Sequence, residues 1–182
     1  EISMNEFESI VARQFDIASG NFPGIELPKY NKYTLCNLRG GIGKTTLAFN
    51  LTYMGGDVLA VDTCPQGKLS YFFDKEYYNN SSTSVRDLIL PYVIPGLGKA
   101  SHVASYVGAT NEFFKDRQAY YIPSSNELYL LPAQLISAIN QTAGLQSPMK
   151  ESALQSILYS LKKEINREME EIGTVSKCLI DT

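Results

Sequence analysis

A glycine-rich run that leads into a lysine and two threonines is the part of this sequence best suited to chemistry. The run reads Gly40-Gly41-Ile42-Gly43-Lys44-Thr45-Thr46. Glycines let backbone N–H groups turn inward around phosphate oxygens, and the N-terminus of a following helix adds partial positive charge. In such a loop Lys44 bridges the β and γ phosphates of a nucleotide, and the Thr45 hydroxyl binds Mg²⁺. The run predicts a site for ATP and Mg²⁺; the alternative is a tight turn that only caps a helix.

The segments around this run are the elements that a phosphate loop requires. Residues 33–38 have the apolar character of a buried strand, and residues 44–54 look helical before a Gly-Gly stop. Further strands are expected at 57–62, 119–122 and 178–181, and further helices at 84–90, 127–141 and 150–172. A kink or break is expected at Pro132, a mobile loop at 79–84, and 101–107 could form a helix. Strands that alternate with helices predict an α/β fold, with a mostly parallel sheet flanked by helices as in P-loop NTPases.

The chain is predicted to have two parts. In residues 1–32, apolar side chains recur at helical spacing over 3–18, and a Pro- and Gly-containing linker follows over 21–31. This extension could dock on a partner or cap the sheet. Residues 33–182 are assigned to an ATPase domain. Because the strand at 178–181 would be buried and nothing follows to cover it, the domain is expected to be cut short after it.

Composition excludes several classes of protein. The chain has 182 residues, of which 44% are hydrophobic and 19% charged, and its net charge is −3. These values fit one globular domain and exclude a disordered chain, a collagen and a disulfide scaffold. No run of apolar residues is long enough for a membrane span, and the mild acidity argues against coating nucleic acid through bulk charge. Cysteines at 36, 64 and 178 and the single His102 indicate neither a zinc site nor a His-rich metal centre, and no GxSxG motif supports a Ser-His-Asp triad.

The phosphate loop resembles that of a known family. Residues 37–46, Asn-Leu-Arg-Gly-Gly-Ile-Gly-Lys-Thr-Thr, resemble the deviant Walker A motif of ParA/MinD ATPases, written KGGxGKT[ST]; Leu38 stands where the standard motif has glycine. Asp62 with Pro65-Gln66-Gly67 resembles the family segment DxDPQG, which Leu69-Ser70 continue, and residues 122–125, followed by Leu128, resemble its IPS segment. Residues 179–182, Leu-Ile-Asp-Thr, resemble its Walker B strand. The Pro-Gln-Gly run favours the ParA/Soj partition branch.

The resemblance assigns a role to each matching residue. It implies that the nucleotide is bound by Gly40, Gly41, Ile42, Gly43, Lys44, Thr45 and Thr46. Asp181 matches the Walker B aspartate that holds the Mg²⁺ shell through water, and Asp62 matches an aspartate of the metal region. Thr45, Asp62 and Asp181 are thus the implied metal residues. The alternative for Asp181 is a strand-end carboxylate that faces solvent.

Two departures from the family pattern affect the predicted catalysis, which is assigned to Lys44, Arg39, Asp62 and Cys64. Cys64 stands where the family has the aspartate that positions the attacking water. A thiol is a poor general base at that place, and losing a positioned base costs about 10²–10⁴-fold in rate. Arg39 replaces the lysine that reaches across the dimer, and its guanidinium can still bind phosphate. We expect MgATP binding with slow hydrolysis; the alternative is that Cys64 is a loop thiol and another residue positions water.

The resemblance implies an ATP-binding protein for plasmid or chromosome partition. ATP would form a homodimer that holds nonspecific DNA through a C-terminal part outside this sequence, and a ParB-like centromere-binding protein would trigger release. The implied location is cytoplasmic and nucleoid-associated, with no membrane contact. A second hypothesis is a non-hydrolysing, nucleotide-dependent scaffold or regulator of the same family. A third is a metabolic or metal-delivery enzyme of the same P-loop class.

Other features have ordinary explanations that compete with functional ones. Residues 96–99, Gly-Leu-Gly-Lys, resemble a phosphate loop, but no strand precedes them. A basic spot on the helix at 150–172 is expected to be a solvated face with i,i+4 pairing: Lys162, Lys163 and Arg167. An aromatic group could pack beneath the loop after Asp62 or form a partner surface: Tyr71, Phe72, Phe73, Tyr77 and Tyr78.

Overall fold

The computed structural model describes residues 31–36, 40–80, 82–94, 96–143 and 147–182. The helix expected at 3–18, and the linker expected at 21–31 apart from Asn31, lie outside these residues. The division of the chain at residue 32 therefore stays a prediction.

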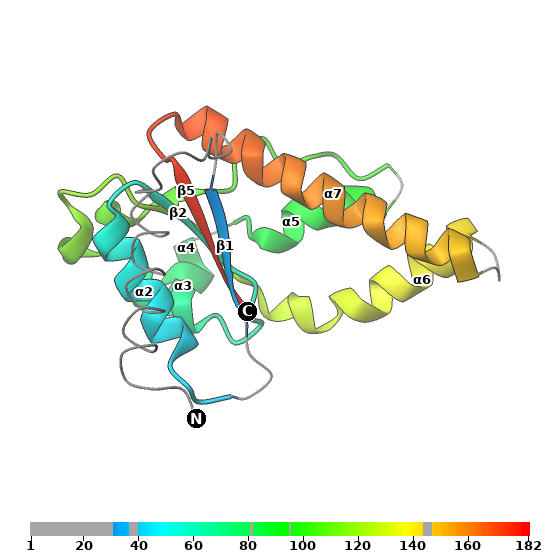
Figure 1. The fold of residues 1–182 in the computed structure, drawn as a ribbon, viewed down its shortest axis with the longest axis horizontal. Coiled ribbons are helices and arrows are strands. Elements are labelled where there is room, and N and C mark those ends of the chain that lie inside the picture. The colour runs from blue at the N-terminus through cyan, green and yellow to red at the C-terminus, as the bar shows by residue number, and fades with distance from the viewer. Residues whose placement is uncertain (1–30, 37–39, 81, 95, 144–146) are drawn as a thin grey trace, which may run out of the picture.

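A mostly parallel sheet forms the centre of the described structure (Figure 1). Its strands are β1 (Asn31–Leu35), β2 (Val58–Asp62), β3 (Ser105–Tyr106), β4 (Tyr120–Ile122) and β5 (Lys177–Asp181). They lie in the order β1-β5-β2-β4-β3, and only β3 runs antiparallel to its neighbour. The predicted α/β class with a mostly parallel sheet is confirmed. The first strand begins at Asn31 rather than at residue 33.

The α-helices are α2 (Lys44–Gly55), α3 (Lys68–Phe73), α4 (Tyr77–Asn80), α5 (Val85–Ile89), α6 (Leu131–Ala143) and α7 (Ser147–Ile172). Short 3₁₀ turns occupy Leu90–Tyr92, Val107–Ala109, Glu112–Phe114 and Asn126–Tyr129. The helices expected at 44–54, 84–90 and 150–172 are confirmed. The helix expected at 127–141 is broken, because a 3₁₀ turn precedes α6 and Pro132 lies in the first turn of α6, where its missing N–H costs nothing.

Two local predictions are wrong. Residues 101–107 do not form a helix: the N–H groups of Val103 and Ala104 donate to the Glu168 carboxylate, and Tyr106 then pairs with Tyr120 in the sheet. These tertiary bonds hold the segment extended. The loop expected at 79–84 is also shorter than predicted, since α4 continues to Asn80.

Two apolar layers cover the sheet, one on each face. All five residues of β2 are buried, and their side chains alternate between the layers. Leu59 and Val61 pack in the layer made with α5 and α7, whereas Val58 and Ala60 pack in the layer made with α2 and α3. From the predicted aromatic group, Phe73 and Tyr77 are buried, while Tyr71 and Phe72 remain half exposed. That group therefore serves mainly as packing.

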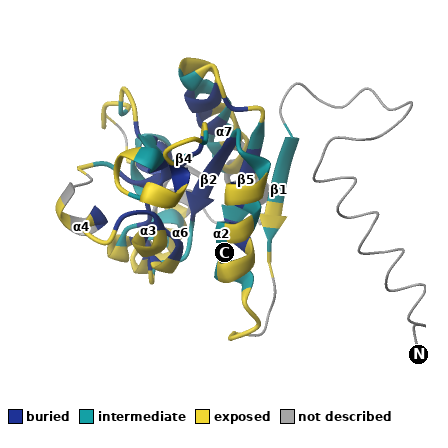
Figure 2. Ribbon diagram, turned by 90° about the vertical axis from the view of Figure 1, so that its left-hand side faces the viewer, coloured by how far each residue is buried: buried dark blue, intermediate teal, exposed yellow. Residues whose placement is uncertain are grey.

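The last strand, β5, lies inside the sheet between β1 and β2. Cys178 lies in the apolar layer with Ile165 and Met169 of α7, and Leu179 lies in the layer of α2 on the opposite face. Figure 2 shows β5 between β1 and β2. The expected burial of this strand is confirmed, and the helices that cover it, α7 and α2, both precede it in the sequence. The expectation that the domain is cut short after this strand stays a prediction.

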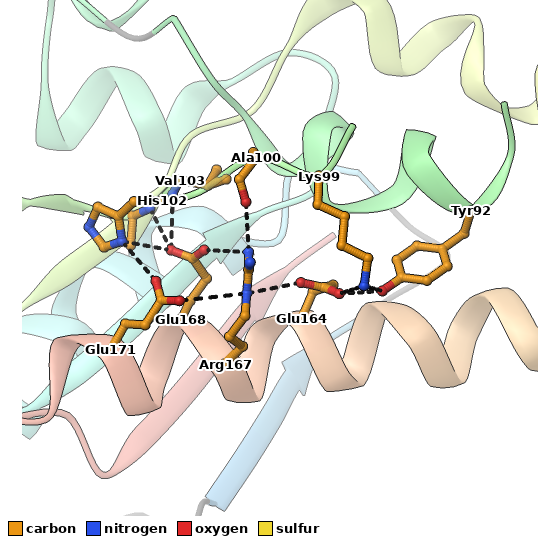
Figure 3. A network of polar contacts seen from close by, with 10 residues as sticks. Tyr92, Lys99, Ala100, His102, Val103, Glu164, Arg167, Glu168 and Glu171 are labelled. Atoms are coloured by element: carbon orange, nitrogen blue, oxygen red, sulfur yellow. Dashed lines mark hydrogen bonds and ion pairs between the residues drawn. The ribbon is translucent and has the colours of Figure 1, made fainter. Parts of the chain in front are cut away.

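Buried charges join α7 to the segment 92–104 (Figure 3). The carboxylate of Glu164 accepts from Lys99 Nζ at 2.8 Å and from the Tyr92 hydroxyl, and Glu168 is fully buried beside Arg167. His102 Nδ1 lies 3.3 Å from Glu168 Oε2. The predicted i,i+4 pairing is confirmed for Arg167, which pairs with Glu171, but the predicted solvated face is wrong for this residue, because its guanidinium also pairs with Glu164 and with buried Glu168. Lys162 and Lys163 are exposed as expected.

The helices α6 and α7 pack on each other and project from the sheet (Figure 1). Within the described residues, no helix combines the length and the apolar character that crossing a membrane requires.

Candidate nucleotide site

The glycine-rich loop reaches α2 through two residues in left-handed backbone conformation. Gly41 has φ 75° and Gly43 has φ 82°, values that side chains disfavour, so glycine is required at both positions. A Cβ placed on Gly40, Gly41 or Gly43 would meet no atom within 4 Å, so space beside the loop is open. Gly43 is also the N-cap of α2, and no side chain caps that end. The first turn of α2 is thus suited to an anion.

Two carboxylates lie side by side at the same edge of the sheet as this loop. Asp62 ends β2, Asp181 ends β5, and the two are paired in register on neighbouring strands. Leu35, at the end of β1, is in register with Asp181 on its other side. Both carboxylates are only 1% exposed. The fold therefore brings together the loop after β1 and two acidic residues that are far apart in the sequence.

The Asp181 carboxylate is poorly satisfied within the described residues. Neither of its buried oxygens has a hydrogen-bond partner of regular geometry there. Burial raises the pKa of Asp181, while a weak hydrogen bond from the Thr45 hydroxyl and the positive charge of Lys44 oppose the rise. A buried carboxylate with so few donors is unfavourable unless a cation or water completes it. Oxygen donors of this kind, next to a threonine hydroxyl, fit Mg²⁺.

Both carboxylate oxygens of Asp62, in contrast, accept hydrogen bonds from residues that follow it in the chain. Its Oδ1 accepts from the Cys64 N–H at 3.1 Å, and its Oδ2 accepts from the Ser70 N–H at 2.8 Å and the Ser70 hydroxyl at 2.7 Å. Burial raises the pKa of Asp62 to about 6, the Ser70 and Cys64 hydrogen bonds oppose this rise, and the charge of Asp181 adds to it. Asp62 thus holds residues 63–70 in place, and its predicted role toward a metal stays a prediction.

Ser70 and Ser124 are residues of this site that the sequence analysis did not assign. The Ser124 N–H donates to the Ser70 hydroxyl oxygen at 2.9 Å, and the Ser124 hydroxyl donates to the Cys64 carbonyl oxygen. Ser70 is fully buried and Ser124 is 4% exposed. The IPS resemblance marked the position of Ser124, and the DxDPQG resemblance, which Leu69-Ser70 continue, marked that of Ser70, but neither indicated their contacts. Together they join the ends of β2 and β4.

The structure also places most of the predicted residues around this edge. Cys64 is half-buried two residues after Asp62, and its carbonyl oxygen accepts from the Gly67 N–H at 2.9 Å. Thr46 is exposed on α2, and Lys44 and Thr45 are half-buried at its start. Arg39 lies outside the described residues, so its predicted role stays a prediction.

A family profile described as an AAA domain matches residues 31–165 of this chain. The chain belongs to this family, which has the ParA/MinD type of P-loop. The match covers the glycine-rich loop, Asp62, Cys64, Ser70 and Ser124. No curated protein sequence matches the chain.

Solved structures of two proteins share the fold. An aspartate-to-alanine variant of Cyanothece McdA in complex with ATP has 23% identity and a TM-score of 0.52, over 86% of this chain and 49% of that one. Cobyrinic acid a,c-diamide synthase from Mycobacterium smegmatis, with bound ADP and magnesium, has 22% identity and a TM-score of 0.50, over 84% and 50%. A Borrelia burgdorferi plasmid partition protein has 17% identity and a TM-score of 0.46, over 85% and 56%. This chain spans about half the length of these proteins.

Proposed function

We propose that this chain binds MgATP at the carboxyl edge of its sheet. The observation that carries the proposal is buried Asp181, whose oxygens have no hydrogen-bond partner of regular geometry among the described residues, next to Thr45 and Lys44 at the start of α2. A phosphate loop without a cation site would not need a buried carboxylate there. Membership of a P-loop family, and the bound nucleotide and magnesium in structures of the same fold, support the same assignment.

Each residue of the site would have a distinct task. The backbone N–H groups of residues 40–46 would bind phosphate oxygens, and Lys44 would neutralise the β and γ phosphates. Thr45 and Asp181 would hold Mg²⁺, directly and through water, with Asp62 behind them. Bound Mg²⁺ would supply charge neutralisation on the phosphates. The residues of the chain would orient the nucleotide, and the buried residues of the site would exclude water.

Hydrolysis is proposed to be slow. Cys64 occupies the place of a water-positioning carboxylate, and its backbone is held by Asp62, Ser124 and Gly67 rather than free to rearrange. A neutral thiol accepts a proton from water much less readily than a carboxylate does. Arg39 is proposed to support phosphate binding, within one subunit or across a dimer.

A partition ATPase is the whole-protein function that we favour. Pro65-Gln66-Gly67 in the loop after Asp62 is the feature that supports the ParA branch, with an ATP-dependent homodimer, nonspecific DNA and a ParB-like centromere-binding protein as partners, and a location on the nucleoid. The fold alone does not separate this function from metabolism, because a diamide synthase shares it. A nucleotide-dependent scaffold without hydrolysis is the second candidate, and Cys64 is the residue that favours it.

Steady-state hydrolysis of MgATP, with and without nonspecific duplex DNA at low salt, tests the choice. Slow turnover that DNA accelerates supports a partition ATPase. Nucleotide binding without turnover in either condition supports the scaffold. Dimer formation with ATP but no affinity for DNA would rule out partition.

A further inference from the structure

A polar cavity lies at the carboxyl end of β4, apart from the glycine-rich loop. Its volume is about 240 Å³. Its walls are residues 82–84, 86 and 87 at the start of α5, residues 124–127, which follow β4, and Tyr77. The glycine-rich loop and Asp181 are not among its lining residues. Ligands of open parallel sheets bind beyond the carboxyl ends of the strands. A cavity of this size is slightly below the usual range for drug-sized ligands and suits a small metabolite.

The walls combine neutral polar groups with one guanidinium and two carboxylates. Hydroxyl and amide groups come from Ser82, Thr83, Ser125 and Asn126, and a guanidinium comes from Arg86. The two carboxylates in the walls already have partners. Asp87 accepts from the Ser84 N–H at 2.7 Å and from its hydroxyl at 3.1 Å, in the capping box of α5. Glu127 Oε2 lies 2.9 Å from Arg86 Nη1.

Arg86 has a donor that the protein leaves unsatisfied. Its Nε is buried and has no hydrogen-bond partner in the part of the chain that the structure describes. Because this N–H is closed to solvent, a ligand in the cavity would meet the exposed part of the Arg86 guanidinium, whose side chain is 26% exposed and whose Nη1 also pairs with Glu127. The guanidinium fork fits the spacing of oxygens in carboxylates and phosphates.

We propose that this cavity binds a small metabolite that carries a carboxylate or phosphate group, with Arg86 as its anchor and the hydroxyls of Thr83 and Ser125 as additional donors. Ser124 also lines the cavity and is hydrogen-bonded to both Cys64 and Ser70. An anion here therefore contacts a residue that holds the loop after Asp62. That contact makes the ligand an effector or co-substrate of the nucleotide site, a step that rests on the proposed function.

Calorimetric titration with succinate and with inorganic phosphate tests the anion site, with erythritol as a neutral control. The titrations use Lys44→Ala protein, so that the phosphate loop does not contribute and the result does not depend on nucleotide binding. Saturable binding of at least one anion, and none of erythritol, is expected. Binding of succinate alone identifies a carboxylate ligand, and binding of phosphate alone identifies a phosphate ligand.

The variants locate the bound anion. Arg86→Met should weaken binding by about 10- to 100-fold, because a charge-assisted hydrogen bond is lost. Arg117→Met removes the same charge where Arg117 stacks on Tyr53, and should leave affinity unchanged. Thr83→Val keeps the charge and shape of the wall and should weaken binding severalfold even if Arg86→Met fails to fold. Binding of neither anion, or equal binding by Arg86→Met and Arg117→Met, would overturn the proposal.

Discussion

Replacing Asp181 by asparagine should have opposite effects on the empty and the loaded protein. The substitution keeps the shape of the side chain and removes its charge. Burial raises the pKa of Asp181, so the folded protein binds this proton more tightly than the unfolded chain does. The ionised carboxylate therefore lowers stability near neutral pH, and removing it should stabilise the protein when Mg²⁺ and nucleotide are absent.

The size of this effect follows from the surroundings of Asp181. The side chain is 1% exposed, and neither oxygen has a hydrogen-bond partner of regular geometry among the described residues. An unsatisfied buried polar group costs about 1–3 kcal/mol, and Lys44 and Thr45 offset part of this cost. Because asparagine still buries an amide, we expect a net gain of about 1 kcal/mol in the free energy of unfolding. For a chain of this length that gain raises Tm by about 2–4 °C.

Thermal unfolding with and without MgATP measures both effects. Ligand at about ten times its Kd should stabilise the wild type by about 1.4 kcal/mol, and the Asp181→Asn protein by much less. Glu112→Gln, which removes one charge from an exposed side chain, should change neither value by more than about 0.5 kcal/mol. Loss of stability in the empty Asp181→Asn protein, or equal stabilisation of both proteins by MgATP, would refute the claim that the buried Asp181 carboxylate needs a bound cation.

Three further outcomes are expected. Because the pKa of Asp62 is raised to about 6 in the folded protein, the folded state binds more protons than the unfolded state between about pH 4 and 6. The free energy of unfolding should therefore fall by about 3 kcal/mol as pH rises through this window. Urea unfolding at several pH values measures this fall, and Asp62→Asn should make the pH dependence flatter. Cys64→Asp should accelerate MgATP hydrolysis by about 10²-fold or more in a phosphate-release assay, and an unchanged rate would argue against a water-positioning role for residue 64. Ser70→Ala should lower the free energy of unfolding by about 1–3 kcal/mol, because the Ser124 N–H and Asp62 lose a buried partner, whereas Ser82→Ala at an exposed position should be neutral.

The strands and helices that depend on local pattern were predictable. The apolar run of β2 does not alternate, as expected for a strand covered on both faces, and the periodicity of α7 is regular over most of its length. The glycine-rich loop was predictable because two of its positions need left-handed backbone. What could not be predicted depends on distant contacts. β3 forms only because Tyr106 meets Tyr120, and Glu168 determines the path of residues 103 and 104.

The candidate site, too, was predictable where sequence motifs marked residues and not where distant contacts place them. Sequence motifs indicated Asp62 and Asp181, yet only the placement of β5 between β1 and β2 makes them neighbours. The sequence motifs assigned both aspartates to the metal, whereas their surroundings differ. The loop after β2 satisfies Asp62, while Asp181 has no hydrogen bond of regular geometry among the described residues. The DxDPQG resemblance reached Ser70 but gave it no role, because that role comes from its hydrogen bonds to Asp62 and Ser124.

Calorimetric titration of this chain with ATP, with and without Mg²⁺, tests the central claim most directly. Matched variants are Lys44→Ala in the loop and Lys115→Ala on an exposed side chain. We expect saturable binding that Mg²⁺ strengthens, loss of that binding in Lys44→Ala, and no change in Lys115→Ala. Binding that ignores Mg²⁺ or persists in Lys44→Ala, or no binding by the wild-type chain, would contradict a MgATP site at the carboxyl edge of the sheet.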